Sequence, residues 1–350
     1  MEESFPMKGG DGQYSYRNNS NAQKEAADQA KLKLEVAIIE NLDIENVTPT
    51  SYTFSIADLG CSVGPNTFIA VNNIIEAVKQ SYKTKFGKLN NLPDFQVYFN
   101  DHTSNDFNLL FSNLPNTREY FAAGVPGSFY NKLFPKSSLN FVYSAFAIQW
   151  LSKVPQELSD LNSPLCNKGR IHYANAPNEV GKAYYSQYEK DMEIFLQARA
   201  QELVPGGLMT ILTPGRRDGN LPAQTSLGPF FLPLETSIVD LANEGILSKE
   251  ALDLFNVPMY YPSKEELQTQ ITRNGCFSIV KVEEYSPEFL PLVSAQQCRA
   301  GFENIITKNF GHKIMEQVFE RYSNKIAGLP PLVANDGTRT GFFVILKHNH

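Results

Sequence analysis

A loop between a predicted strand and a predicted helix has residue types that could hold a small ligand. It runs Asp58-Leu-Gly-Cys-Ser-Val-Gly64, directly after the β-prone segment 54–57. Gly60 and Gly64 have no Cβ, so the backbone could approach a ligand closely at both positions. The loop matches neither the Gly-x-Gly-x-x-Gly pattern of dinucleotide sites nor the Gly-Lys-Ser/Thr ending of phosphate loops. It favours a nucleoside ligand without a phosphate to bind, typically S-adenosylmethionine (SAM), although an ordinary tight turn would have the same pattern.

A carboxylate ends the next predicted strand, 94–101. Asp101 follows Asp58 after a span that one strand–helix–strand unit would fill. A carboxylate at this point can accept hydrogen bonds from both hydroxyls of a ribose. A solvated aspartate at a strand end would look the same, so the sequence leaves both interpretations open.

Hydrophobic periodicity predicts the elements that would position these residues. Apolar side chains recur at three- and four-residue intervals after Pro65, which is typical of a helix that begins there. Pro205-Gly-Gly207 is expected to end a long helix. Further strands are predicted at 119–125, 139–150, 208–212, 277–285 and 341–347, and further helices at 106–114 and 184–203. Strand and helix alternate with short connections, which favours an α/β fold with a parallel sheet.

The alternation stops between residues 216 and 274. This block is mostly helical or irregular, and Ser263-x-x-Glu266 is a capping box that predicts the start of a helix. We expect 216–274 to form a helical cap over the carboxyl edge of the sheet, where α/β proteins bind their ligands. Residues 25–215 and 275–350 would then form the core.

Composition excludes several classes of protein. The chain has 350 residues and a net charge of −6, which disfavours a nucleic-acid partner because such a partner needs a basic face. The sequence shows neither a signal peptide nor an apolar run long enough for a membrane span, so no membrane partner is expected. Its four cysteines are far apart and predict reduced thiols of a cytoplasmic protein.

Eight ordered motifs resemble one family over nearly the whole chain. They are Met7-Lys-Gly-Gly10, Ser15-Tyr-x-x-Asn-Ser20, Ala57-Asp-Leu-Gly-Cys-Ser-x-Gly-Pro-Asn66, Phe99-Asn-Asp-x-x-x-Asn-Asp-Phe-Asn108, Gly124-Val-Pro-Gly-Ser-Phe-Tyr130, Gln149-Trp-Leu-Ser-Lys-Val-Pro155, Arg199-Ala-Gln-Glu202 and Asp253-x-Phe-Asn-Val-Pro258. Together they resemble the plant SABATH methyltransferases, which methylate salicylate, jasmonate, loganate, farnesoate or, in the caffeine pathway, purine nitrogens. The resemblance implies a Rossmann-like class I methyltransferase sheet, SAM as cofactor and a homodimer in plant specialised metabolism.

The resemblance also implies positions for the cofactor. Residues 1–24, glycine-rich and polar enough to be a flexible tail, would instead form a lid that includes Lys8. His102 departs from the family, where an apolar residue often covers the adenine, but its ring can stack there too. The implied cofactor contacts are Tyr16, Ser20, Asp58, Cys61, Asn66, Asp101, His102, Ser128 and Phe129.

Gln23 and Trp150 are the implied binders of the substrate carboxylate. A carboxylate is already ionised at cellular pH and needs no general base to attack a methyl sulfonium. The amide and the indole are neutral donors, which hold the carboxylate without withdrawing much of its electron density. On residue type alone, Trp150 would be interpreted as a large core residue. The implied pocket adds Phe146, Gln149, Pro214, Phe230, Phe231 and Cys298.

Gln149 differs from the His or Met of most relatives and bears on the substrate. A neutral polar group beside a largely apolar pocket predicts an acid with a second polar atom, such as an iridoid or a hydroxylated aromatic acid. Some members also carry a magnesium-type ion, which would be structural here. Its implied ligands are Asn167, Asp253, the carbonyl of Phe255 and Asn256, all of which donate oxygen.

Three other functions remain possible from the sequence. A nicotinamide-dependent dehydrogenase is disfavoured by the spacing of the glycine loop. A non-enzymatic receptor for a small acid would not need that loop or Asp101. A xanthine-type N-methyltransferase is the main alternative, and Gln23 as a carboxylate partner disfavours it.

Overall fold

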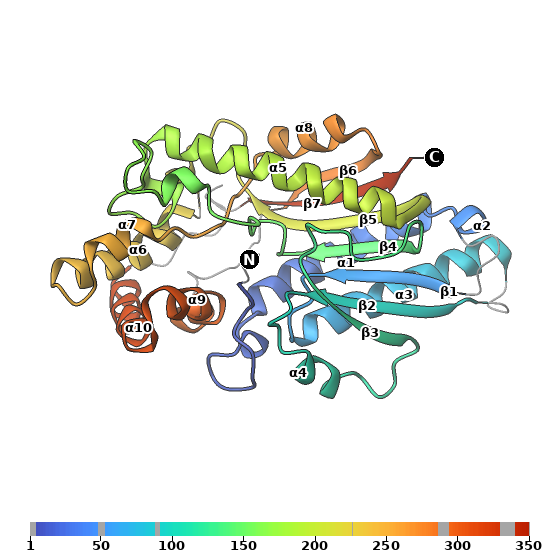
Figure 1. Cartoon of the computed structure of the whole chain (residues 1–350). Helices are drawn as coiled ribbons and strands as arrows, with labels where there is room; N and C mark the ends of the chain where they lie inside the picture. The colour runs from blue at the N-terminus through green and yellow to red at the C-terminus, as the bar shows by residue number, and fades with distance from the viewer. Residues whose placement is uncertain are drawn as a thin grey trace.

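The centre of the computed structural model is a mixed sheet with the strand order β3-β2-β1-β4-β5-β7-β6 (Figure 1). The structure describes residues 5–47, 53–87, 92–225, 227–285, 294–329 and 340–349. β1 to β5 pair in parallel, whereas β7 runs antiparallel to both of its neighbours. The predicted α/β fold is confirmed. The strands are β1 (Thr53–Leu59), β2 (Asp94–Asp101), β3 (Phe121–Pro126), β4 (Leu139–Ala145), β5 (Leu203–Gly215), β6 (Phe277–Tyr285) and β7 (Thr340–His348).

Helices cover both faces of the sheet, which is why β1 and β4 are buried almost throughout. The predicted apolar stripe of α3, with Phe68, Val71 and Ile74, is buried in the hydrophobic core that this helix shares with β1 and β2. α1 packs beside α3, while α5 and α8 lie on the opposite face (Figure 1). The helices around the sheet are α1 (Asn21–Asn41), α2 (Ile44–Val47), α3 (Pro65–Phe86), α4 (Phe107–Ser112), α5 (Asn178–Glu202) and α8 (Lys264–Asn274).

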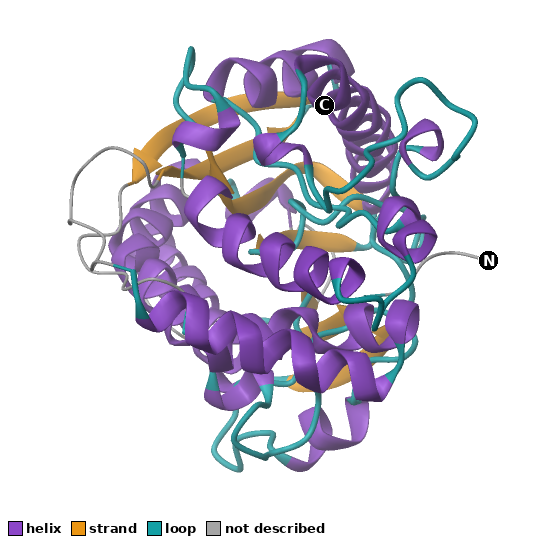
Figure 2. Cartoon of the chain, turned by 90° about the vertical axis from the view of Figure 1, so that its left-hand side faces the viewer, coloured by secondary structure: helices purple, strands orange, loops and turns teal. Residues whose placement is uncertain are grey.

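A second group of helices lies beyond the carboxyl ends of the parallel strands (Figure 1), on the side of the molecule that faces the viewer in Figure 2. α6 packs against α10, and α10 packs against α9. The predicted capping box of Ser263 and Glu266 is present at the start of α8, but α8 packs on α5 and β6 instead of joining this group. The domain boundaries at 216 and 274 stay a prediction. The helices of this group are α6 (Leu227–Asn243), α7 (Lys249–Leu254), α9 (Ala295–Phe310) and α10 (His312–Ala327).

The end of α5 agrees with the prediction, but α5 begins earlier than residue 184 and β5 begins earlier than residue 208. α5 begins at Asn178 and ends at Glu202, and β5 begins immediately at Leu203, so Pro205-Gly-Gly207 lies inside the strand. The pairing of β4 with β5 changes register here, and Gly206 has a φ of +78°. A glycine at an irregularity lets the strand continue past a proline, which sequence patterns alone interpret as a helix stop.

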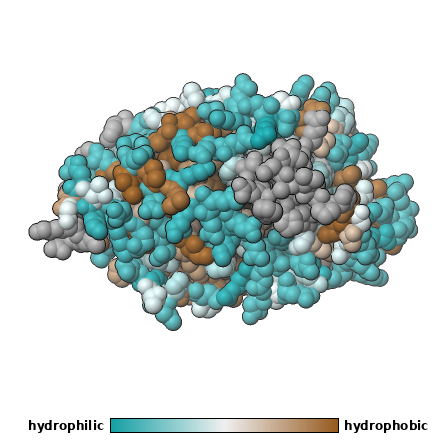
Figure 3. Space-filling model, turned by 180° about the vertical axis from the view of Figure 1, so that it is seen from behind, coloured by the Kyte–Doolittle hydropathy of each residue, from teal (hydrophilic) through white to brown (hydrophobic). Residues whose placement is uncertain are grey.

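The back of the molecule is mostly hydrophilic, with apolar side chains gathered in separate areas (Figure 3). Leu32 and Val36, both on α1, are among the large apolar side chains that remain exposed. Within the described ranges, no helix combines the length and apolarity that crossing a bilayer requires.

Candidate functional site

The loop after β1 folds tightly over the end of β2. The N–H groups of Gly60 and Cys61 both donate to the carbonyl of Asn100, at 2.9 and 3.0 Å. Gly60 has a φ of +85°, and a Cβ there would collide with the Cβ of Ala147. The structure thus supplies a packing reason for this glycine, where the sequence suggested close approach to a ligand. A Cβ at Gly64 would make only an ordinary contact with Ser20.

Asp101 is fixed by the backbone of this loop. Its two carboxylate oxygens accept from the N–H groups of Ser62 and His102, each at 2.8 Å. Ser62 has a φ of +51°, a left-handed conformation that is uncommon outside glycine and asparagine and turns its N–H toward the acid. Burial raises the pKa of Asp101, and the two N–H groups oppose that shift. Each carboxylate oxygen keeps a free lone pair, so the acid can still accept from two ligand hydroxyls.

Asp58 is in β1, directly before this loop, and accepts a hydrogen bond from the hydroxyl of Thr67, a partner that the sequence did not predict. Burial raises the pKa of Asp58 to about 7, although the Thr67 bond opposes the shift. Asn66, at the start of α3, donates to the carbonyl and hydroxyl oxygens of Ser20, at 3.1 and 3.0 Å. The predicted cofactor residues before and after β1 are therefore in contact.

The N-terminal segment is tied to α9. Lys8 forms an ion pair with the nearly buried Glu303, and its N–H donates to the carbonyl of Ala300 at 2.9 Å. The guanidinium of Arg299 lies 4.1 Å from the ring centre of Tyr14. These contacts bring residues 5–20 over the end of the sheet, although their composition is that of a flexible tail. Residues 1–4 of the predicted lid lie outside the described residues.

Seven of the predicted site residues line one cavity at the carboxyl end of the sheet. They are Tyr16, Asp101, His102, Ser128, Phe129, Phe146 and Trp150. Phe5, Met7, Tyr130 and Ser152 also line it and were missed by the sequence analysis. The other described residues that were predicted for the cofactor or the substrate lie outside its wall, among them Gln23, Gln149, Phe230, Phe231 and Cys298.

The indole of Trp150 is half-buried between aromatic rings. Phe5 stacks on it with ring centres 6.4 Å apart, and Phe302 of α9 lies 5.5 Å away. The ring centre of Phe302 also lies 5.4 Å from that of Phe230 of α6, so this one ring contacts both Trp150 and α6. The sequence offered no signal for Phe302, because its neighbours come from distant parts of the chain.

The two glutamines predicted to bind the substrate, Gln23 and Gln149, each have a buried side-chain oxygen without a partner among the described residues. Gln23 is in the first turn of α1, and its Oε1 is buried without a hydrogen-bond partner among the described residues. Gln149 donates from Nε2 to the carbonyl of Phe146 at 2.8 Å, and its Oε1 is likewise buried and unpaired there. Buried acceptors without partners are uncommon in folded proteins and are candidates for contact with a ligand or a bound water.

Two residues predicted for the substrate pocket are packed into the protein. Phe231 is fully buried and stacks on His172, with ring centres 4.0 Å apart. Burial lowers the pKa of His172 to about 3, so that ring is neutral. Cys298 is 1% exposed, and burial raises the pKa of its thiol to about 12.

The predicted ion ligands come together in one place. Asn167 donates to Oδ1 of Asn256 at 2.8 Å, and Asp253 accepts from the N–H of Gly169 at 2.8 Å. Oδ1 of Asn167 is buried without a partner among the described residues. The described chain has no group of three or more His, Cys, Asp and Glu side chains that could hold a metal. Asp253 is thus the single anionic group that the predicted set would offer to an ion.

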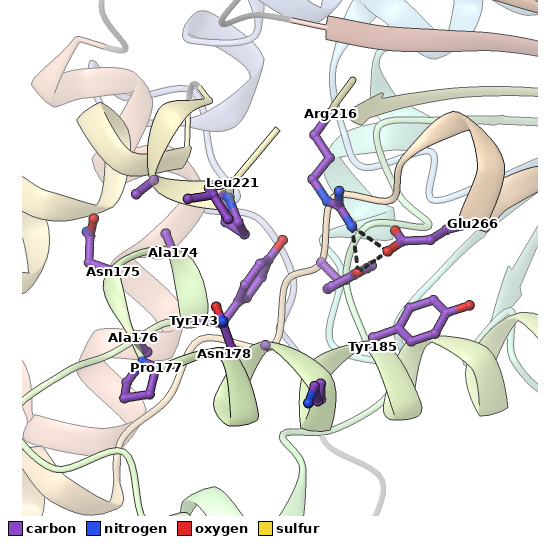
Figure 4. A pocket seen from close by; sticks show the side chains of 15 residues that line it. Tyr173, Ala174, Asn175, Ala176, Pro177, Asn178, Tyr185, Arg216, Leu221 and Glu266 are labelled. Carbon is purple, nitrogen blue, oxygen red and sulfur yellow. Dashed lines mark hydrogen bonds and ion pairs between the residues drawn. The ribbon is translucent and has the colours of Figure 1, made fainter. Parts of the chain in front are cut away.

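A larger cavity, of about 570 Å³, lies elsewhere, between η3 (Tyr173–Asn175), the start of α5 and η4 (Pro222–Gln224) (Figure 4). Its principal charged groups bond to one another: Arg216 forms an ion pair with Glu266, and the hydroxyl of Tyr260 donates to Glu266 at 3.0 Å. None of the predicted cofactor or substrate residues lines it. We therefore place the candidate active site at the smaller cavity, which contains Asp101 and Trp150.

The sheet order and an acid at the tip of β2 are typical of α/β enzymes that bind a nucleoside cofactor. The chain belongs to the family of SAM dependent carboxyl methyltransferases, which it matches over residues 2–349. It is 47% identical to the loganic acid O-methyltransferase of Catharanthus roseus over 332 residues, 93% of this chain and 88% of that protein. It is 39% identical to the farnesoic acid carboxyl-O-methyltransferase of Arabidopsis thaliana over 358 residues, 100% of both.

A solved structure, of loganic acid methyltransferase with S-adenosylhomocysteine (SAH), gives a TM-score of 0.92 at 43% identity over 99% of both chains. These findings confirm the SABATH resemblance, the Rossmann-like methyltransferase fold and SAM-dependent methylation of small acids. Xanthine-type N-methylation has less support, because the matched family is one of carboxyl methyltransferases.

Proposed function

We propose that the chain methylates a small oxygenated acid, whose carboxylate is bound by Trp150 and Gln23. The observation that carries this proposal is that Trp150 and Asp101 line the same cavity. An acid bound at the indole would therefore lie beside a nucleoside bound at Asp101. SAM supplies a methyl group on a sulfonium, which the carboxylate oxygen can attack without a general base.

The residues of the candidate site would then have two roles, one in binding the cofactor and one in binding the substrate carboxylate. Asp101 would hold the ribose hydroxyls, with the rings of Phe129 and His102 in the same cavity wall. Trp150 and Gln23 would hold the carboxylate in line with the methyl group, at a reacting distance of about 3–3.5 Å. Phe5 and Phe302 pack against the indole and exclude water from that side.

Trp150→Phe tests this proposal, because phenylalanine keeps a ring in the cavity and removes the N–H donor. A hydrogen bond to a charged group contributes about 1.5–3 kcal/mol, so kcat/KM for the acid should fall roughly 10- to 100-fold. SAH affinity, measured by calorimetry, serves as the control and should stay unchanged. Undiminished methyl transfer by Trp150→Phe would refute the role of the indole.

We further propose that Gln149 selects an acid with a hydroxyl near its carboxylate. One N–H of the Gln149 amide donates to the carbonyl of Phe146, and the unpaired Oε1 is the atom that can accept from a substrate hydroxyl. An iridoid or a hydroxylated aromatic acid offers such a donor, and a plain acid such as farnesoate does not. Loganic acid as the substrate of a 47% identical relative supports this class.

Gln149→Met is expected to lose selectivity for oxygenated acids and gain activity on plain ones. Leaving Oε1 unpaired beside a plain acid costs about 1–3 kcal/mol, and the substitution removes that penalty. The measurement is kcat/KM over a panel of both kinds of acid, with exposed Gln197→Met as the matched control. A wild-type preference for plain acids that persists in Gln149→Met would contradict the proposal.

A structural ion held by Asn167, Asp253, the Phe255 carbonyl and Asn256 is also proposed, supported by the unpaired buried oxygen of Asn167. The ion would stabilise the loop before η3. It would take no part in methyl transfer, since an ionised substrate carboxylate can attack the methyl group without activation by a Lewis acid. The homodimer and the cytoplasmic location likewise stay predictions.

A further inference from the structure

The segment that carries Trp150 is held at every backbone N–H from residue 150 to residue 152. The N–H of Trp150 donates to the carbonyl of Ala147 at 3.0 Å, and that of Leu151 donates to Pro258 at 2.8 Å. The N–H of Ser152 donates to Oδ2 of Asp191 at 2.8 Å. A loop fixed in this way can present a side chain with little freedom of orientation.

Asp191 and Tyr130 provide the side-chain part of this support. Asp191 is 1% exposed in the middle of α5, and its Oδ1 accepts from the Ser152 hydroxyl at 2.6 Å and from Gln187 at 2.8 Å. The hydroxyl of Tyr130 donates to the carbonyl of Trp150 at 2.6 Å. Asp191 thus binds the backbone N–H two residues after Trp150, and Tyr130 binds the backbone carbonyl of Trp150 itself.

The backbone around Tyr130 is bound in turn by two residues of α5, Arg199 and Glu202. The ion pair of Arg199 and Glu202 is fully buried, and Arg199 donates to the carbonyls of Phe129 and Asn131, on either side of Tyr130. Glu202 accepts from the N–H groups of Leu133 and Phe134. One face of α5 therefore supports both the loop with Phe129 and the loop with Trp150.

We propose that Asp191 and Tyr130 are positioning residues that orient the Trp150 indole for methyl transfer. Tyr130 lines the cavity and Asp191 lies outside its wall, and both hold the backbone of residues 150–152. The inference rests on the proposed function, in which Trp150 binds the carboxylate. It adds to that function a positioning role for Asp191, a buried carboxylate on α5.

The sequence offers a direct readout, because Trp150 is the single tryptophan of the chain. Intrinsic tryptophan fluorescence of the full-length protein reports on this residue alone. Tyr130→Phe and Asp191→Asn each remove hydrogen bonds to the Trp150 loop with little change in shape. Each is expected to raise acrylamide quenching of Trp150 at least twofold and to lower kcat/KM for the acid at least tenfold, with SAH affinity retained.

Two matched variants separate positioning from general damage. Tyr188→Phe removes a buried hydroxyl that has no partner among the described residues, and Glu193→Gln neutralises an exposed carboxylate on the same helix. Neither should change quenching or turnover. If Asp191→Asn does not fold, Tyr130→Phe and Ser152→Ala carry the test, since both leave the buried carboxylate in place.

The outcomes distinguish the two proposals. Full activity of Trp150→Phe would refute the proposed function. A strongly impaired Trp150→Phe together with unchanged quenching and turnover in Tyr130→Phe and Asp191→Asn would overturn the positioning role alone. Increased quenching with unchanged kcat/KM would also overturn it, because the indole would have moved without consequence for the reaction.

Discussion

Asp101→Asn is expected to weaken SAH binding by roughly 100-fold. Each hydrogen bond from a ribose hydroxyl to a buried carboxylate contributes about 1.5–3 kcal/mol, and two of them would be weakened or lost. The amide keeps the size of the acid, but its nitrogen cannot accept. That nitrogen would also face one of the two N–H groups, of Ser62 or His102, that now donate to the carboxylate.

Titration calorimetry measures this effect directly, with both SAM and SAH. Asp94→Asn is the matched control, because Asp94 is an exposed carboxylate at the other end of the same strand. It should bind both ligands like the wild type. Equal affinities of Asp101→Asn and the wild type would remove Asp101 from the cofactor site.

Arg199→Met is expected to destabilise the fold by about 3–5 kcal/mol. The substitution leaves Glu202 as an unpaired charge in a site with no exposure, which is a costly arrangement. It also removes the donors to the carbonyls of Phe129 and Asn131. Urea unfolding of the Arg199→Met variant should show a lower midpoint.

The double variant Arg199→Met/Glu202→Leu should recover only part of this loss. Removing both charges relieves the unpaired carboxylate, but the N–H groups of Leu133 and Phe134 then lose their acceptor. Arg273→Met is the control, since Arg273 is largely exposed and 3.7 Å from Glu189. A loss below about 1 kcal/mol in Arg199→Met would contradict this account of the buried pair.

The sequence predicted best where local pattern and topology act together. The strand that ends at Asp101 and the helix that begins at Pro65 follow from periodicity, and the meeting of Asp58 and Asp101 at one sheet edge follows from parallel pairing. The predicted start of β5 was wrong because Pro205 and Gly206 signal an interruption, whereas pairing with β4 keeps the segment extended from Leu203. Tertiary pairing overrode a local propensity there.

The supporting residues of the site could not be found in the same way. Phe302, Tyr130 and Asp191 act on Trp150 across the fold, and nothing in their sequence neighbourhood indicates that contact. A partial signal did exist in α5, where Gln187, Asp191 and Arg199 recur on a face that is otherwise apolar. Buried polar residues on an amphipathic helix indicate partners, but not which ones.

The antiparallel β7 has a consequence for how the chain reaches its fold. β7 lies between β5 and β6, yet it follows both in the sequence, after the intervening helices α9 and α10. Until β7 is synthesised, β5 and β6 have no common neighbour and each leaves an unpaired edge. The nascent chain therefore emerges with an open sheet, and pairing across more than a hundred residues must close it. We therefore expect this late, non-local closure to slow folding and to leave the unpaired edges open to aggregation before the site has formed.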